Sequence, residues 1–469
     1  LKTLGELGRN TVAMERTVEY RGEPTARFST DVRFTIANMT AEFGGLNGIF
    51  EPDGVVAEWI DRRPPDGIRA GARYFRADDD APYASRYRID LASLGPLVAV
   101  PFSPDNVVPV EKEAGRALDG AFIGACTTTE EEIVLGALVL EAALAAGEKP
   151  VATENRIVVP GDLSIQRNVR DAGLWQVYEA AGFAVDPPGC SMCLGIASRK
   201  AGRGEVWLSS QNRNYKNRMG EGSLAYLASA ATVAASSLGM KIRDPRPLLA
   251  RVDPTRWERI LGRAGRPLPA IATSEPEVRV AAPAPAAGAA STQARPPLAG
   301  CIQRFGDHVD TDAIIPGEFC HLTKLEDLGA KAFAFVRPEF VARVAAGQDV
   351  VVAGEAWGSG SSREQAVWAL QGAGVRAVIA KSFAFIHKRN LVNEALPFLV
   401  VPDAEFYELA REGEAVTVDF ERGEVTVGGR TFAAHGATPM VRALSRAGGL
   451  VPAIQRHGTS VFTQLAEPS

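Results

Sequence analysis

The sequence predicts a multidomain α/β protein in which largely parallel sheets are flanked by helices, with a linked C-terminal domain. Three observations lead to this prediction. Short buried strands alternate with helical segments between residues 110 and 260. A further strand, glycine-rich turn and helix follow at residues 349–366, and a Pro/Ala-rich tract separates the two regions.

The composition narrows the class of protein. The 469 residues include 51 Lys and Arg against 56 Asp and Glu, which gives a formal net charge of -5, and 46% of them are hydrophobic. This acidic balance argues against nucleic acid as a partner, and no apolar run is long enough to span a membrane. Five cysteines in a chain without an apolar leader indicate a reducing compartment, so we expect a cytoplasmic enzyme.

Four regions are expected along the chain. Residues 1–110 are predicted as a partial α/β domain, residues 111–261 as a second α/β domain, residues 262–298 as a linker and residues 299–469 as the C-terminal domain. The linker assignment depends on residues 281–290, where Pro and Ala occur without helical periodicity.

The second region is expected to begin with a strand and a helix. Residues 121–123 are predicted as a short buried strand and residues 133–146 as a helix, with Thr128 and Glu131 spaced as a capping box. The next elements are a strand at 157–160, a helix at 163–181, a strand at 206–209 and a helix at 222–238. Because ligands collect at the carboxyl ends of parallel strands, the loops after the first and third of these strands should share one edge.

Three cysteines form the candidate chemical site. Cys190 and Cys193 lie in a C-x-x-C that places two thiols on one tight loop. By itself this loop leaves a metal site open beside a disulfide, a redox pair and a structural zinc site. Cys126 precedes a predicted helix N-terminus, whose dipole favours a thiolate. Three thiolates without a fourth ligand suit an iron-sulfur cluster with one open iron.

Three motifs carry a family resemblance: G-A-C-T-T at 124–128, G-C-S-M-C-L-G at 189–195 and S-Q-N-R-N-Y-K-N-R at 210–218. They resemble the cluster and substrate motifs of the aconitase superfamily, which includes aconitase, 3-isopropylmalate dehydratase and homoaconitase. The resemblance implies a 4Fe-4S cluster whose open iron binds the hydroxyl and a carboxylate of the substrate. The implied cluster ligands are Cys126, Cys190 and Cys193.

The same resemblance implies residues that bind the substrate. Arginine gives carboxylates a bidentate contact that lysine does not. The implied substrate-binding residues are Asn212, Arg213, Arg218 and Ser362. Tyr215 and Asn217 stand where the family usually has Phe and Gly.

A helical pattern over residues 33–43 is stopped by Gly44. Asn38 and Glu42 lie four residues apart, so we expect them on one face of this helix. They are either two polar surface positions or, as the resemblance to the family's N-M-x-x-E helix implies, catalytic residues that reach the active site.

The glycine-rich turn of the C-terminal domain is not a P-loop, because no Lys follows its glycines. Ser361 and Glu364 have capping-box spacing, so Ser361 on its own is predicted as a helix N-cap. G-S-G-S-S-R-E resembles the swivel-domain motif of the family, which implies that Ser361 is the catalytic base and that Arg363 binds a substrate carboxylate. Gln365 replaces the usual His of that motif.

Other residues are expected to be structural. His387 lies in a helix-like stretch and is predicted to be a hydrogen-bonded structural histidine. Cys301 and Cys320 lie outside any motif and are predicted to be unligated.

The resemblance implies an iron-sulfur hydro-lyase that reversibly dehydrates and rehydrates a hydroxy di- or tricarboxylate. The stretch D-T-D-x-I-I-P at 310–316 favours the 3-isopropylmalate dehydratase type, and aconitate hydratase and homoaconitase are the alternatives. A cluster-bearing regulator or a partner-dependent, non-catalytic protein is the second class. All five histidines lie at or beyond His308, so the family's N-terminal His and Asp have no counterpart, and we expect the chain to be part of a longer enzyme.

Overall fold

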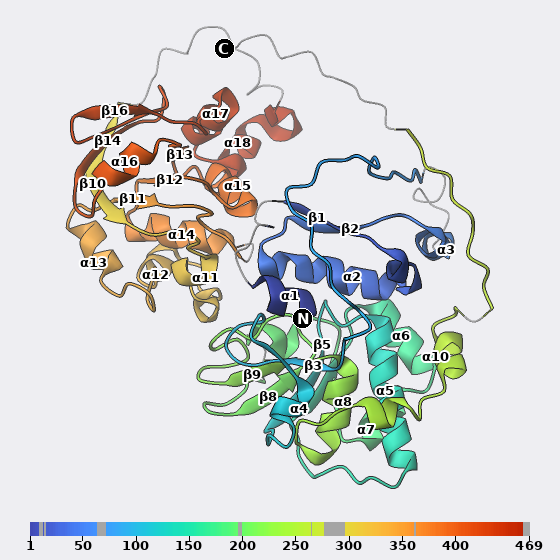
Figure 1. The fold of residues 1–469 in the computed structure, drawn as a ribbon. Coiled ribbons are helices and arrows are strands. Elements are labelled where there is room, and N and C mark those ends of the chain that lie inside the picture. Colours follow the sequence, from blue (N-terminus) through green and yellow to red (C-terminus); the bar gives the residue numbers. More distant parts are fainter. Residues whose placement is uncertain are drawn as a thin grey trace. The chain divides into compact units, whose positions relative to one another are not determined.

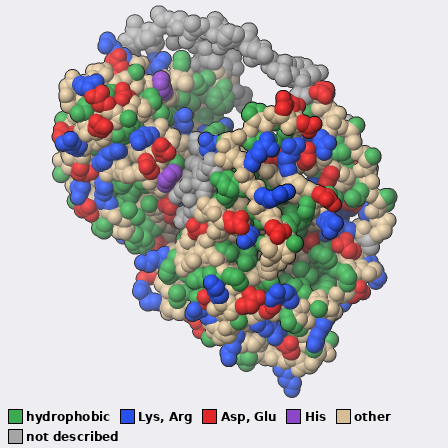
Figure 2. Space-filling model, in the orientation of Figure 1, with side chains coloured by type: hydrophobic (Ala, Val, Ile, Leu, Met, Phe, Trp, Pro, Cys, Tyr) green, Lys and Arg blue, Asp and Glu red, His purple; other side chains and the backbone are tan. Residues whose placement is uncertain are grey.

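The chain folds into two units, which are considered separately. The structure is a computed structural model that describes residues 1–8, 13, 16–62, 72–195, 199–263, 265–275, 296–360 and 363–462. Contacts divide the chain into Leu1–Glu277 and Val278–Ser469 (Figure 1). On the face shown in Figure 2, basic and acidic side chains are interspersed on both units. No helix in the described ranges combines the length and apolar character needed to cross a bilayer.

The first unit is built on a largely parallel sheet. Within the described residues the sheet has seven strands in the order β4-β3-β9-β8-β5-β6-β7, and the neighbours from β9 to β7 are parallel. A separate parallel pair, β1-β2, precedes it. The strands are β1 (Thr17–Tyr20), β2 (Asn47–Phe50), β3 (Leu97–Ala99), β4 (Val107–Pro109), β5 (Gly120–Gly124), β6 (Arg156–Val159), β7 (Ala184–Val185), β8 (Val206–Ser209) and β9 (Leu224–Leu227).

Helices cover this sheet and complete the α/β architecture. The α-helices are α1 (Lys2–Leu7), α2 (Thr30–Met39), α3 (Gly54–Asp61), α4 (Val110–Glu113), α5 (Glu130–Ala145), α6 (Leu163–Asp171), α7 (Trp175–Ala180), α8 (Ala230–Gly239), α9 (Arg246–Leu249) and α10 (Pro254–Ile260). Short 3-10 helices are η1 (Glu23–Arg27), η2 (Thr40–Phe43) and η4 (Ser191–Leu194). Helices α5 and α8 pack on each other and on β5 in the main core (Figure 1). The predicted α/β class with largely parallel sheets is confirmed.

Two predicted helices of this unit are wrong in extent. The helix expected at 163–181 is two helices, α6 and α7, because Gly173 adopts φ 71° between them. The helix expected at 222–238 begins only at Ala230, where the Ser229 side chain accepts the Thr232 N–H as a cap. The preceding apolar residues form β9, since a strand buried on both faces has the same apolar composition as a buried helix.

The capping box expected before α5 is also absent. The predicted strand at 121–123 lies within β5 and the predicted helix lies within α5, so both elements are confirmed. However, the N-cap residue is Thr129, without a side-chain cap, and the Thr128 hydroxyl instead donates to the Gly124 carbonyl at 2.8 Å. Thr128 therefore ties the end of β5 to its own loop rather than capping the helix.

Glu132 in α5 makes the stability of the first unit depend on pH. Burial of its carboxylate raises its pKa to about 7, although the Ala230 N–H donates to it at 3.3 Å. The folded state therefore binds this proton more tightly than the unfolded state, so stability should fall as pH rises from about 4.5 through about 7. Glu132→Gln should remove this slope and stabilise the protein at pH 8 by about 1 to 3 kcal/mol.

Chemical denaturation at a series of pH values between 5 and 8 measures this effect. Glu179→Gln, on the exposed surface of α7, is the matched control and should keep the wild-type slope. Equal slopes for wild type and Glu132→Gln would contradict the assignment.

The second unit has a mixed sheet. Within the described residues its seven strands follow the order β13-β12-β11-β10-β14-β15-β16, parallel from β13 to β10 and antiparallel from β10 to β16. The strands are β10 (Leu298–Arg304), β11 (Val350–Ala353), β12 (Ala377–Ala380), β13 (Phe398–Val400), β14 (Ala415–Asp419), β15 (Glu424–Val427) and β16 (Arg430–Ala433). The parallel half carries the predicted strand, glycine-rich turn and helix.

Helices flank this sheet as well, and two clusters of buried apolar side chains form its core. The helices are α11 (Thr311–Ile314), α12 (Leu325–Gly329), α13 (Phe340–Ala345), α14 (Glu364–Ala373), α15 (Phe385–Asn393), α16 (Ala404–Leu409), α17 (Pro439–Ala447), α18 (Leu450–His457) and the 3-10 helices η5 (Gly317–Phe319) and η6 (Gly458–Ser460). Most of the expected linker, residues 276–295, lies outside the described residues, so the four-region division remains a proposal.

Candidate functional site

The carboxyl ends of β5 and β8 meet at one edge of the first sheet. The two strands are parallel and aligned so that Phe122 pairs with Ser209. Beyond them, the Ser210 hydroxyl accepts the Gly124 N–H at 3.0 Å and lies 2.7 Å from the Thr128 hydroxyl. These contacts bring the Cys126 loop and the Asn212 loop together at this edge, as expected from the parallel topology.

Three thiols lie on loops that follow parallel strands of this sheet, Cys126 after β5 and Cys190 and Cys193 after β7. Cys126 and Cys190 are exposed, whereas Cys193 is buried in η4. The Arg218 guanidinium lies 3.7 Å from the Cys193 sulfur and donates to it. Burial raises the pKa of the Cys193 thiol, Arg218 opposes this shift, and Cys126 and Cys190 add to it. Cys126 and Cys190 therefore add a small unfavourable effect to the charged form of Cys193.

The chemistry of these donors suits an iron-sulfur cluster. Thiolates are soft ligands, and three of them with a nearby guanidinium suit a sulfur-ligated group of negative charge. In the described part of the chain, no three His, Cys, Asp or Glu side chains are grouped closely enough to hold a single metal ion. The donor atoms are therefore of the type that the sequence motifs imply, but the described side chains are not grouped into a metal site.

Glu42 is held by the loop that follows β8. Its side chain is only 1% exposed, and it accepts hydrogen bonds from Arg213 Nε at 2.9 and 3.0 Å. Asn212 Nδ2 donates to the same carboxylate at 2.8 Å, and the Tyr215 hydroxyl lies 3.5 Å from its second oxygen. A buried carboxylate needs such partners to stay charged. The N-terminal segment and the β8 loop are therefore joined at the candidate site.

Asn38 does not share the environment of Glu42. Asn38 is exposed on α2, whereas Glu42 is buried in η2, the tighter turn that follows. The expectation that the two residues occupy one helix face is wrong, because the α-helix ends at Met39 and the i, i+4 relation does not continue into the 3-10 turn. The helix itself and its glycine stop are confirmed, since Gly44 adopts φ 95°.

Two residues of the loop after β8 have structural roles at the site that the sequence did not predict. Asn214 is fully buried and its Nδ2 donates to the Val100 carbonyl at 3.1 Å, which anchors the loop to the segment after β3. Tyr215 stands where the family usually has Phe, and its hydroxyl lies beside Glu42. The signal that could have found Asn214 is its place directly after the site residues Asn212 and Arg213 in N-R-N.

In the second unit, Arg363 is bound by the D-T-D segment. Its Nη1 donates to Asp312 Oδ1 at 2.6 Å and to the Ile315 carbonyl at 3.1 Å, and the residue is 7% exposed. Ser361 and Ser362 lie outside the described residues. Helix α14 begins at Glu364 with Arg363 as its N-cap residue, so the prediction of Ser361 as the N-cap is wrong. Asp312 was missed as a partner of Arg363, although its motif was noticed.

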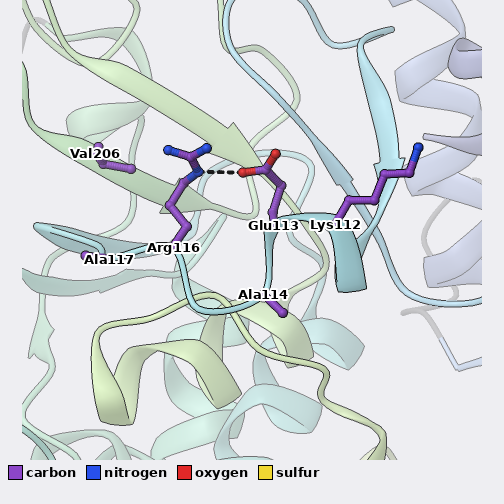
Figure 3. A pocket seen from close by; sticks show the side chains of 6 residues that line it. All are labelled: Lys112, Glu113, Ala114, Arg116, Ala117 and Val206. Atoms are coloured by element: carbon purple, nitrogen blue, oxygen red, sulfur yellow. Dashed lines mark hydrogen bonds and ion pairs between the residues drawn. The ribbon is translucent and has the colours of Figure 1, made fainter.

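A surface hollow of about 420 Å³ lies elsewhere on the first unit (Figure 3). It is lined by Lys112, Glu113, Ala114, Arg116, Ala117 and Val206. Val206 starts β8, so the hollow lies at the amino ends of the parallel strands, opposite the cysteines. Glu113 and Arg116 form an ion pair across it. Nothing in this lining links the hollow to the candidate site.

The geometry defines the class first: an α/β protein whose parallel sheet presents three thiols and two arginines at its carboxyl edge. Comparison then identifies the family, and the chain belongs to the aconitase family. The profile of the Aconitase family (aconitate hydratase) matches residues 1–239, and that of the Aconitase C-terminal domain matches residues 300–403. Members of this family are hydro-lyases.

Several curated relatives resemble the chain. It is 42% identical to an aconitase of Aspergillus rugulosus, covering 99% of this chain and 57% of that protein. It is 39% identical to a 3-isopropylmalate dehydratase large subunit of Glarea lozoyensis (99% and 59%) and 33% identical to a mitochondrial homoaconitase of Eremothecium gossypii (90% and 65%). The chain thus spans less than two thirds of the length of these relatives.

Proposed function

We propose that the chain carries most of the active site of a hydro-lyase that reversibly dehydrates and rehydrates a hydroxy di- or tricarboxylate. The contact of Arg218 with the sulfur of Cys193, the residue on which Cys126 and Cys190 act electrostatically, is the observation that carries this proposal. Among substrates, a 3-isopropylmalate type is our first choice, and citrate and homocitrate types are the alternatives, because relatives with all three kinds of name match the chain.

A 4Fe-4S cluster held by the three cysteines is part of the proposal. Its chemical contribution, when bound, is a Lewis acid that polarises the hydroxyl to be eliminated. Two features of the chain support its binding here: the three thiols lie on loops that follow strands of one parallel sheet, and the Arg218 guanidinium favours the thiolate form of Cys193.

The residues of the chain have separate proposed roles. Arg213, Arg218 and Arg363 bind substrate carboxylates, and fixed guanidinium planes favour this binding because less side-chain freedom is lost. Glu42 sets the plane of Arg213 through two contacts to its Nε, and Asp312 orients Arg363 in the same way. Asn212 and Ser362 complete the set that contacts substrate, and Asn38 remains a candidate despite its exposure.

Ser361 is proposed as the base that removes the proton alpha to a carboxylate. A serine hydroxyl is a weak acid, so its alkoxide needs stabilisation by nearby donors. Glycine-flanked backbone at the start of α14 is a favourable place for such stabilisation, because unpaired N–H groups point out of a helix N-terminus.

Anaerobic purification of the full-length gene product followed by assay on several hydroxy acids tests the proposed function. The iron-sulfur absorbance would be recorded, and citrate, isopropylmalate, homocitrate and methylated malates would be compared as substrates. Turnover of one acid is expected and would identify the substrate. A bound cluster without turnover of any acid would favour the regulatory or partner-dependent class. A cytoplasmic location is a proposal too, since the Eremothecium gossypii relative is named a mitochondrial protein.

Ser361→Ala is expected to abolish turnover and to leave the cluster absorbance unchanged. The substitution removes the proposed proton acceptor, and general acid-base groups contribute about 10² to 10⁴ in rate. Steady-state kinetics and the visible spectrum of the same sample measure both quantities. Ser460→Ala, at an exposed serine of this unit, is the control for the loss of a hydroxyl elsewhere. Wild-type turnover by Ser361→Ala would remove Ser361 from the mechanism.

A further inference from the structure

Helix α5 is capped by a residue that lies far away in the sequence. Its own N-cap residue, Thr129, makes no side-chain cap. The Asp31 carboxylate on α2 instead accepts the Glu131 N–H, in the first turn of α5, at 3.1 Å. An acidic side chain there satisfies one of the free N–H groups of the helix and interacts favourably with its dipole. Helix α2 is therefore joined to the start of α5, directly after the Cys126 loop (residues 125–129).

Two further polar contacts hold this junction. The Ser29 hydroxyl donates to the Glu131 carboxylate, and Arg263 Nη1 lies 2.8 Å from the same carboxylate. Arg263 Nη2 also lies 3.7 Å from Asp31. The side chains of Arg263, Asp31 and Glu131 are 18%, 17% and 9% exposed, so water screens their charges only in part. The position of α2 relative to α5 is consequently fixed by several contacts at once.

Thr35 on α2 contacts the Cys126 loop itself. It lies four residues after Asp31, so the two side chains share one face of the helix. The Thr35 hydroxyl donates to the Thr127 carbonyl at 3.2 Å, across 92 positions of the sequence. Thr127 is 3% exposed and directly follows Cys126. The contact therefore acts on the backbone next to the cysteine.

The Cys126 loop has a backbone conformation that needs support. Ala125 adopts φ 67°, in the left-handed region, which is unfavourable for a residue with a Cβ atom. Before this residue, the Gly124 N–H is bound by the Ser210 hydroxyl at 3.0 Å. Thr35 supplies a contact on the other side, after Cys126. The loop is thus held from both sides by side chains of distant segments.

The segment that contains Thr35 also holds the loop after β8. Its last turn, η2, carries Glu42, which accepts hydrogen bonds from Arg213 Nε at 2.9 Å and from Asn212 Nδ2 at 2.8 Å. Residues 29–42, which we call the brace, therefore contact the Cys126 loop near one end and the loop after β8 at the other. A helix between two loops limits how far each can move relative to the other.

We propose that the brace holds the two loops in a fixed relation and that Thr35 is the positioning residue for Cys126. The inference rests on the proposed function, in which Cys126 binds the cluster and Arg213 binds a substrate carboxylate. Thr35 contacts neither the cluster nor the substrate in this proposal. It acts on the cysteine only through the carbonyl of Thr127.

Thr35→Val tests the proposal, because it removes the hydroxyl and keeps the β-branched shape. Thr35→Ser keeps a hydroxyl and is the rescue variant. Thr417→Val, at an exposed threonine of β14 in the second unit, is the matched control. Amide hydrogen exchange of residues 125–129 and alkylation of Cys126 by iodoacetamide are measured on the full-length gene product without its cluster. Alkylation of Cys190, which is also exposed, is the internal reference.

Thr35→Val should accelerate amide exchange of the Cys126 loop by about fivefold or more, the effect of one hydrogen bond of ordinary strength. Alkylation of Cys126 should accelerate as well, whereas alkylation of Cys190 and thermal unfolding should stay close to wild type. In the loaded protein, the electron paramagnetic resonance spectrum of the cluster should change and the cluster should be lost faster in air. Thr35→Ser should restore these values, and Thr417→Val should match wild type.

Wild-type loop exchange and Cys126 alkylation in Thr35→Val would overturn the proposal. Equal acceleration in Thr417→Val would also overturn it, because the effect would then be unspecific. If Thr35→Val does not fold, Asp31→Ala replaces it, with the same expected acceleration in the loop and the same contradiction if none is seen. If the wild-type protein binds no cluster, the proposed function fails by itself. The measurements on the cluster-free protein still decide whether Thr35 holds the loop.

Discussion

Cys193→Ser is expected to abolish cluster incorporation and, with it, turnover. Cys193 is the buried member of the three cysteines and the one whose sulfur contacts Arg218. Serine offers a hard oxygen that is protonated at neutral pH, whereas iron-sulfur clusters are held by thiolates. Iron and acid-labile sulfide content, together with visible absorbance after anaerobic reconstitution, measure the loss directly.

The matched control for this prediction is Cys301→Ser. Cys301 lies on β10 in the second unit and is partly exposed, so the same chemical change there should leave the cluster intact. Thermal unfolding of the metal-free proteins separates loss of a ligand from loss of the fold. Wild-type iron content and spectrum in Cys193→Ser would show that this cysteine is not a ligand. Loss of the cluster in Cys301→Ser would show that the effect is unspecific.

Arg213→Met should destabilise the first unit by about 3 to 5 kcal/mol, the usual cost of leaving one member of a buried ion pair without its partner. Glu42 is 1% exposed and Arg213 is 16% exposed, so the substitution would leave a buried carboxyl group without its cationic partner. Asn212 and Tyr215 would still contact the carboxylate, but neither brings a compensating positive charge. Denaturant unfolding gives the free energy of unfolding for comparison with wild type.

The double-mutant cycle tests whether the effect belongs to the pair. Glu42→Gln removes the buried charge, so the variant that carries both Glu42→Gln and Arg213→Met should be more stable than Arg213→Met alone. Arg203→Met is the control, because Arg203 pairs with Glu221 while 76% exposed and should change stability by about 1 kcal/mol or less. Equal destabilisation by Arg203→Met and Arg213→Met would contradict a special role for the buried pair.

The sequence predicted the strands and helices best where local signals are strong. Residues 206–209 form β8 as expected, and the helix at 33–43 stops at Gly44, because a glycine with positive φ ends a helix by local geometry. The prediction failed where a buried strand and a buried helix have the same apolar sequence pattern. The apolar residues of β9 were assigned to a helix, since only their place between β3 and β8 makes them a strand.

The sequence predicted which residues belong to the candidate site but not which of them contact one another. The resemblance of the motifs to the family implied Cys126, Arg218 and Glu42 as site residues. They did not indicate that Arg218 lies at the sulfur of Cys193, or that Glu42 is the common acceptor for the loop after β8. Each of these contacts joins residues far apart along the chain, and no local pattern specifies such a distance.

His387 is another residue whose contacts could not be predicted from the sequence. Its helix-like surroundings were recognised, and α15 does contain it, but hydrogen bonding was expected of it on the general behaviour of buried histidines. Both of its ring nitrogens are buried without partners among the described residues, so that expectation is wrong in this structure. Its contact with Gly358 depends on how α15 packs against a turn that comes about thirty residues earlier in the printed sequence.

The sequence by itself determined the family, the α/β class and the residue types that can do the chemistry, because the donor atoms of thiols and guanidinium groups and the backbone freedom of glycine belong to the residue types themselves. Only the tertiary structure decided which of these groups meet, which are buried and which lack partners. The physical reason is that burial and pairing arise from long-range packing, and packing sets the desolvation and the charge neighbours that govern each group.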